Sequence, residues 1–211
     1  MPRTPEQYEK IRKGKRKLIM DTALGLFAGE GYHSTSISKI AAKAGISKGL
    51  MYNYFESKEA LIHSIMEEGM KALTELFDPN KDGVLTDDEF DFFVNRSFDI
   101  LRDNPTYWRL YFSIMMQEGI YELFKDRYTQ IIDETIVLLL DYYKRQGVED
   151  PETEALLFGA MMDGISMNYL LGKDSFPLEK MKKAVIERFG HKKSKQDHSN
   201  NRLIKERKEQ K

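Results

Sequence analysis

Residues 78–89, DPNKDGVLTDDE, carry oxygen-bearing side chains at regular intervals. Asp78, Asn80 and Asp82 alternate along the chain, a glycine follows, and Glu89 closes the run. Calcium is a hard, large cation that takes about six to eight oxygen ligands. The sequence therefore predicts Ca²⁺ binding in this segment. The predicted ligands are Asp78, Asn80, Asp82, the Val84 carbonyl, Thr86 and Glu89.

The segment resembles an EF-hand loop. Gly83 stands at the sixth position, where the loop turns, and Leu85 at the eighth, where an apolar side chain packs on the core. A reading without metal is also open, because DPNKDG is ordinary turn sequence and TDDE fits a helix-starting capping box. EF-hands usually occur in pairs, and the sequence shows no second loop.

The elements around this segment follow helical periodicity, with apolar residues recurring at spacings of three and four. This pattern predicts an all-α protein with an N-terminal helix-turn-helix unit and a C-terminal helical bundle. We expect a DNA-binding domain over 1–57, a regulatory and dimerisation domain over 58–190, and a basic, disordered tail over 191–211. The expected helices are about 19–28, 37–44, 47–54, 58–77, 87–104, 105–116, 121–145, 152–171 and 177–189.

Two short helices joined by residues 44–47, AGIS, predict a helix-turn-helix. Gly45 suits a left-handed turn residue, and Ser47 can cap the second helix, whose first residues would face base edges in the major groove. Lysines and the start of the helix after Ser36 would contact phosphates. The residues predicted to contact DNA on this physical reading are Ser36, Lys39, Lys43, Lys48, Gly49, Tyr52, Asn53 and Lys58. Such helix pairs also occur purely for packing.

Residues 19–61 resemble the N-terminal domain of the TetR family of bacterial transcriptional regulators. The matching positions are Ala23, Leu26, Phe27, Gly31, Thr35, Ile40, Ala41, Ala44, Gly45, Ser47, Gly49, Tyr52, Tyr54, Phe55, Lys58 and Leu61. The resemblance implies a homodimer on a palindromic double-stranded DNA operator and a C-terminal domain controlled by a small-molecule effector. It adds Leu50 and Tyr54 to the DNA-contacting residues, and it places Tyr54 and Lys58 on phosphates.

The resemblance also implies that the helix after the DNA-binding domain, about 58–77, transmits the ligand state to the DNA. This helix leads directly into residues 78–89, so we expect calcium to bias operator affinity by fixing the far end of that helix. The N-terminal residues 8–17 are rich in Lys and Arg. They form a basic arm that we expect to approach flanking phosphates or the minor groove.

The C-terminal domain holds two further candidates. Helix 152–171 mixes small and large apolar residues, as a dimer seam requires, although an internal core helix would show the same pattern. An aromatic and Met-rich segment suits a pocket for an apolar ligand, or simply the core. The predicted pocket residues are Trp108, Tyr111, Phe112, Met115 and Met116.

Composition limits the remaining functions. The chain has no Cys and four His without triad or zinc spacing, so we expect no enzyme. It has no apolar run long enough to cross a bilayer and no signal peptide, so we expect a cytoplasmic protein without membrane contact. The leading interpretation is a dimeric repressor. The contrasting one is a calcium-binding interaction protein in which the helix-turn-helix serves only as scaffold.

Overall fold

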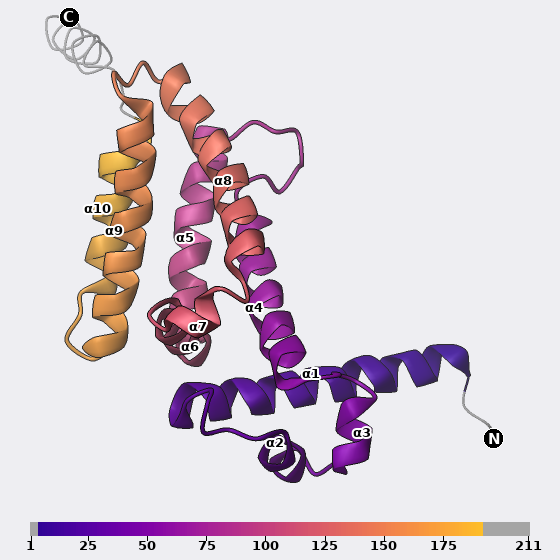
Figure 1. Cartoon of the computed structure of the whole chain (residues 1–211). Helices are drawn as coiled ribbons and strands as arrows, with labels where there is room; N and C mark the ends of the chain where they lie inside the picture. The colour runs from indigo at the N-terminus through magenta and orange to yellow at the C-terminus, as the bar shows by residue number, and fades with distance from the viewer. Residues whose placement is uncertain (1–3, 192–211) are drawn as a thin grey trace, which may run out of the picture.

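The computed structural model describes residues 4–191, apart from the side chains of residues 118 and 127. Within this range the chain is entirely helical, as predicted (Figure 1). Its helices are α1 (Pro5–Glu30), α2 (Ile37–Lys43), α3 (Lys48–Tyr52), α4 (Lys58–Thr74), α5 (Asp87–Asp103), α6 (Pro105–Met115), α7 (Glu118–Tyr121), α8 (Lys125–Arg145), α9 (Pro151–Leu171) and α10 (Leu178–Phe189).

Helices α1 to α3 form the N-terminal helix-turn-helix unit, with α2 and α3 on one side of α1 (Figure 1). Ser36 and Ser47 cap α2 and α3, and each hydroxyl accepts a hydrogen bond from the backbone three residues on. Gly45 has a φ of +65°, which glycine adopts without the cost that a side chain adds. Fully buried Ile19, Ile40 and other apolar side chains hold the three helices together. The predicted turn between α2 and α3 is therefore present.

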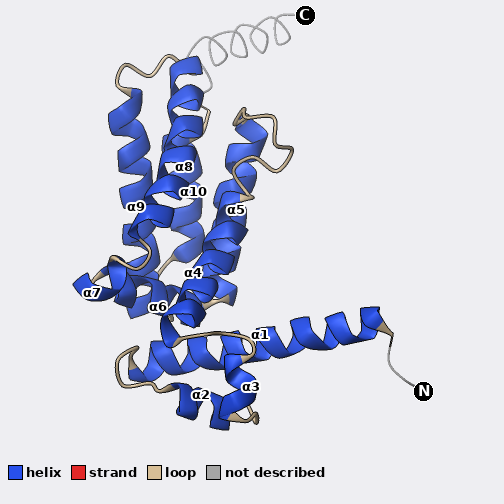
Figure 2. Ribbon diagram, turned by 45° about the vertical axis from the view of Figure 1, so that its right-hand side comes forward, coloured by secondary structure: helices blue, strands red, loops and turns tan. Residues whose placement is uncertain are grey.

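Helix α4 leaves this unit and runs upward into the C-terminal bundle (Figure 2). Its first half packs against α1, and its second half lies beside α8. Helices α5, α8, α9 and α10 stand roughly upright beside it, while α6 and α7 lie at the lower end, where α6 contacts α1 (Figures 1 and 2). One continuous core joins both parts.

The basic arm, the helix α7 and the start of α8 differ from the sequence prediction. The basic arm is not a separate segment, because α1 begins at Pro5, where Thr4 and Gln7 form a capping box. The short helix α7 was not predicted, and α8 begins at Lys125 rather than near residue 121. The expected disorder of the tail concerns residues that, from 192 on, lie outside the described range. None of the described helices is long and apolar enough to cross a membrane.

Candidate nucleic-acid interface and ligand cavity

The outer face of α3 is the first candidate site. Met51 is fully buried and anchors the helix, whereas Lys48, Gly49 and Asn53 are exposed and the Tyr52 side chain is 47% exposed. Leu50 is half-buried. The helix therefore presents an ammonium, an amide and a phenol on one accessible face, and these groups can hydrogen-bond to base edges or phosphates.

The predicted phosphate contacts around α2 differ in how free they are. The Ser36 hydroxyl accepts a hydrogen bond from the Lys39 backbone at 3.2 Å, so Ser36 caps α2 in the protein without DNA. The Lys39 ammonium pairs with Glu30 of α1. Lys43 is exposed in the last turn of α2. Of the two lysines, Lys43 is thus the more available to a phosphate without breaking an existing pair.

Lys58 occupies a different environment from the one predicted for a phosphate contact. Its Nζ donates to the Tyr32 carbonyl at 3.0 Å and lies 4.2 Å from the centre of the Tyr32 ring. The Tyr32 hydroxyl in turn donates to Glu59 at 3.1 Å, and burial together with this bond raises the pKa of the Tyr32 phenol. Lys58 therefore ties the first turn of α4 to the end of α1. Tyr54 is half-buried and packs on the same core.

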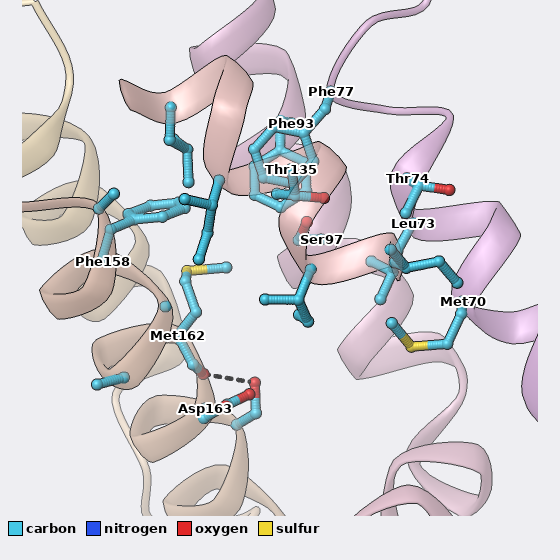
Figure 3. Close-up of a pocket in the computed structure, with 18 of the residues that line it drawn as sticks. Met70, Leu73, Thr74, Phe77, Phe93, Ser97, Thr135, Phe158, Met162 and Asp163 are labelled. Atoms are coloured by element: carbon cyan, nitrogen blue, oxygen red, sulfur yellow. Dashed lines mark hydrogen bonds between the residues drawn. The ribbon is translucent and has the colours of Figure 1, made fainter. Parts of the chain in front are cut away.

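The second candidate site is a cavity of about 420 Å³ inside the C-terminal bundle (Figure 3). Five helices line it, so residues almost a hundred positions apart meet there. The lining residues from α4 and the turn after it are Met70, Leu73, Thr74 and Phe77; those from α5 are Phe93, Ser97, Phe98 and Leu101; α6 gives Trp108 and Tyr111; α8 gives Tyr128, Ile131, Ile132, Thr135, Ile136 and Leu139; and α9 gives Ala155, Leu156, Phe158, Gly159, Ala160, Met162, Asp163 and Ser166.

A few polar groups interrupt this apolar wall. The Tyr111 and Tyr128 hydroxyls share a hydrogen bond of 3.0 Å. The Ser97 hydroxyl and the Trp108 indole N–H are buried and have no hydrogen-bond partner in the described part of the chain. Asp163 contributes a carboxylate at the solvent-exposed edge of the cavity, and partial desolvation by the atoms around it raises the pKa of that carboxyl. A mostly apolar cavity with a few convergent polar groups has the character of a small-molecule site.

Of the five predicted pocket residues, the structure places Trp108 and Tyr111 on the cavity wall. Phe112 packs edge-on against Tyr111 behind that wall, and Met116 is exposed. Met115 lines a separate hollow of about 20 Å³. Phe112, Met115 and Met116 do not line this cavity, because the segment forms a helix and only one of its faces meets the cavity; their contact with a ligand stays a prediction.

Asp163 was missed by the sequence prediction. A signal for it was present, since it is the one charged residue between Glu154 and the end of α9. It stands in a helix that is otherwise almost wholly apolar.

The predicted calcium site does not form in the structure. Within residues 4–191 no three His, Cys, Asp or Glu side chains lie close enough together to hold a metal ion. Asp78 accepts bonds from the backbone of Asp82 and Gly83 at 3.0 and 2.9 Å. Glu89 accepts from the Thr86 backbone at 2.9 Å and from its hydroxyl at 2.8 Å. The carboxylate expected to close the metal shell is therefore turned to the N-terminus of α5 as half of a capping box.

The remaining predicted ligands fit this picture. Asn80 donates to Asp82 at 3.0 Å, and the Val84 backbone donates to Asp82 at 2.8 Å. Gly83 has a φ of +77°, and Leu85 is fully buried while its carbonyl accepts from Arg145 at 2.6 Å. The turn and the apolar anchor were predicted correctly, but they form a hydrogen-bonded loop and a helix cap rather than an assembled metal site.

A helix-turn-helix unit with an exposed second helix, joined by one long helix to a bundle with an apolar cavity, defines a class of protein. It consists of a DNA-binding domain and a ligand-binding domain in an all-helical chain. Residues 19–65 match the family described as "Bacterial regulatory proteins, tetR family". Residues 19–65 therefore match a TetR-type DNA-binding domain, and the described part of the chain has the all-helical TetR fold.

Individual relatives agree with this assignment. The chain is 32% identical over 171 residues to the uncharacterized HTH-type transcriptional regulator YuxN of Bacillus subtilis, an alignment that covers 75% of this chain and 54% of the relative. It is 30% identical over 93 residues to the fatty acid metabolism regulator protein of the same organism, covering 44% of this chain and 48% of that protein. The chain thus spans about half the length of these curated relatives.

Among solved structures, the fatty acid degradation regulator FadR from Bacillus halodurans superposes with a TM-score of 0.68 at 20% identity. The superposition covers 91% of this chain and all of that one. At this level of identity the likeness shows the fold alone.

Proposed function

We propose that the chain is a sequence-specific transcriptional repressor that binds a palindromic operator as a homodimer and is released by a small-molecule effector. One observation carries this proposal: the exposed recognition helix and the cavity are connected by a single helix, α4. The first half of α4 buries Leu61, Ile62 and Ile65 in the core near α1. Its second half contributes Met70 and Leu73 to the cavity wall.

A ligand that moves the second half of α4 would therefore move the DNA-binding unit. Helix α6 provides a second connection, because it contacts α1 and also contributes Trp108 and Tyr111 to the cavity. The Tyr107 hydroxyl of α6 donates to the Met66 carbonyl of α4 at 3.3 Å inside the core. The cavity and the DNA-binding unit are thus joined by two packed helices, through which a change at one site can be transmitted to the other. By linkage, an effector that lowers operator affinity would itself bind less tightly to the operator-bound protein.

The proposed dimer seam lies on α9. In the single chain this helix exposes large apolar side chains, including Leu157 at 47% and Leu171 at 83%. Exposed apolar groups in a row mark a protein interface more often than an ordinary surface. Sedimentation velocity of Leu157→Glu combined with Met161→Glu should show a monomer, while Leu123→Glu, an exposed leucine just before α8, should leave the dimer intact. Equal sedimentation of both variants and the parent would place the interface elsewhere.

The effector proposed for this site is apolar. Two related proteins are named for fatty acid metabolism or degradation, and the cavity wall is largely aliphatic and aromatic. An acyl or alkyl chain would fit such a wall, since apolar surface removed from water supplies most of the binding free energy.

The test of the DNA-binding proposal is selection of bound duplexes from a random pool, followed by fluorescence anisotropy on the selected duplex. We expect a palindromic sequence and binding that weakens steeply with salt. Lys48→Ala in α3 should weaken binding by at least about tenfold. Lys173→Ala, which removes the same charge from an exposed turn, should not. If no sequence preference emerges, the helix-turn-helix serves as scaffold and the contrasting interaction-protein reading gains support.

Calcium has no part in the proposed mechanism, because the carboxylates of residues 78–89 are engaged in loop and cap hydrogen bonds. Calcium control would need those bonds to be replaced by metal coordination. Isothermal calorimetry with CaCl₂ decides the matter. Heat of binding that disappears in Asp78→Ala and in Glu89→Ala would support a calcium site in residues 78–89. The absence of any heat of binding would argue against such a site.

A further inference from the structure

The ionisable groups of the cavity wall are unevenly distributed. Among the described lining residues there is one carboxylate, Asp163, and there is no Lys, Arg or His. The Asp163 carboxylate forms no hydrogen bond or ion pair with any side chain that the structure describes. It lies at the edge of the cavity, next to Met162 (Figure 3), where the residue is exposed to solvent in the single chain. The cavity therefore holds a negative charge without a matching positive one.

The side chains of two tyrosines lie near this carboxylate. The negative charge of Asp163 is close enough to Tyr111 and Tyr128 to contribute to the raised pKa of both phenols. Trp108 lies edge-on to Tyr111, with 5.4 Å between the ring centres. The negative faces of aromatic rings and a nearby carboxylate both attract cations, most strongly where water is excluded.

We infer that the effector is a lipophilic monocation, with its apolar body along the α4, α5 and α8 walls and its cationic head between Asp163 and the Tyr111–Tyr128 pair. This inference rests on the proposed function, because it names the ligand class of the same cavity. A volume of about 420 Å³ suits one small amphipathic molecule. The buried Ser97 hydroxyl and Trp108 indole N–H would donate hydrogen bonds to a neutral oxygen of that molecule where it carries one.

A fatty acid is the competing ligand, since its carboxylate could accept from Ser97 and Trp108. That arrangement would place a second negative charge in the cavity that holds Asp163, with no basic side chain among the described lining residues to compensate either charge. Like charges in an apolar surrounding repel strongly. The structure therefore favours a cationic head over an anionic one.

The test compares three probes with the same alkyl chain by isothermal calorimetry on the full chain: dodecyltrimethylammonium, dodecan-1-ol and dodecanoate. We expect the cation to bind about tenfold or more tightly than dodecanoate. Asp163→Asn should remove that preference while leaving the affinity for dodecan-1-ol unchanged. Asp133→Asn, an equal charge change on the exposed side of α8, should preserve the preference.

Tighter binding of dodecanoate, or an Asp163→Asn variant that still prefers the cation, would overturn the inference. Operator binding by the parent chain is measured in parallel by anisotropy. Operator binding without cation preference would refute the cationic effector and leave the repressor intact. Cation binding without operator binding would leave the cavity assignment intact and refute the repressor.

Discussion

Gly69 in α4 faces the Tyr107 ring of α6 so closely that no side chain fits between them. A methyl group built on Gly69 would overlap ring atoms Cε2 and Cζ of Tyr107 and its hydroxyl. The ring cannot easily yield, because Tyr107 is only 8% exposed and lies edge-on to Trp108 at 5.6 Å. Gly69→Ala should therefore push α4 and α6 apart at the level where the cavity meets the DNA-binding unit.

The expected change in the free energy of unfolding of Gly69→Ala is the sum of two losses and one gain. Forcing extra volume into a packed core costs about 1–3 kcal/mol. Losing the Tyr107 hydrogen bond to the Met66 carbonyl costs about 1 kcal/mol more. Replacing a mid-helix glycine by alanine gains about 1 kcal/mol in helix propensity. The net loss in the free energy of unfolding is about 2 kcal/mol, which for a chain of this size lowers Tm by about 4–8 °C.

The assay is thermal unfolding followed by circular dichroism, with all proteins at the same concentration because the proposed dimerisation would raise the apparent stability. Gly25→Ala is the matched control: Gly25 lies within α1 and a methyl group there meets no atom within 4 Å, so the variant should be slightly more stable than the parent. In Gly69→Ala with Tyr107→Leu, the smaller residue makes room, so the double variant should lose less stability than the sum of the two single ones. A Gly69→Ala variant as stable as Gly25→Ala would refute the close packing of α4 on α6.

Three further predictions concern single sites. If Lys48 contacts one phosphate, Lys48→Ala should reduce the slope of log Kd against log salt concentration by about 0.9. Fluorescence anisotropy at several NaCl concentrations measures this slope. Asp163→Asn should be at least as stable as the parent at neutral pH, because partial desolvation raises the pKa of this carboxyl and its ionised form is then less favourable in the folded state than in the unfolded one. Urea unfolding should show this difference shrink as pH falls toward about 3.9, the ordinary Asp pKa, and a destabilised variant at pH 7 would contradict it. Thr86→Ala should cost about 1 kcal/mol in urea unfolding through loss of the α5 cap, and an unchanged midpoint would mean that Glu89 alone suffices.

The helix-turn-helix unit was predictable because its determinants are local. Ser36, Ser47 and Gly45 each act on the backbone within a few residues, and the buried positions of α1 to α3 follow helical spacing. The start of α1 was missed although its signal was equally local, since Thr4, Pro5 and Gln7 form a capping box with Pro in the first turn. The basic composition of the following residues suggested a DNA-approaching arm, but charge alone does not determine backbone conformation.

The cavity was much less predictable, because its wall is a property of packing. Met70 of α4 and Ser166 of α9 both line it, and no local pattern records that they meet. Richness in aromatics and Met located the correct helix, α6. It could not select Trp108 and Tyr111 over Phe112 and Met115, since the selection depends on how α6 is rotated against α5 and α8. The informative signal was instead Asp163, a single charge in an otherwise apolar stretch of α9, which the structure places at the exposed edge of the cavity.

Residues 78–89 show why spacing of ligand types overstates a metal site. Coordination needs the carboxylates of Asp78, Asp82 and Glu89 to converge, whereas the sequence specifies only that they are present at suitable intervals. The same residues have local alternatives: Asp78 bonds the backbone of the turn, and Glu89 reaches back to Thr86. Each alternative is satisfied within five residues and needs no ion, so the loop can hold this conformation on its own. Because Leu85 and its bond from Arg145 anchor the loop to α8, its place in the protein is to join α4 to α5 at the far end of the helix that we propose carries the effector signal.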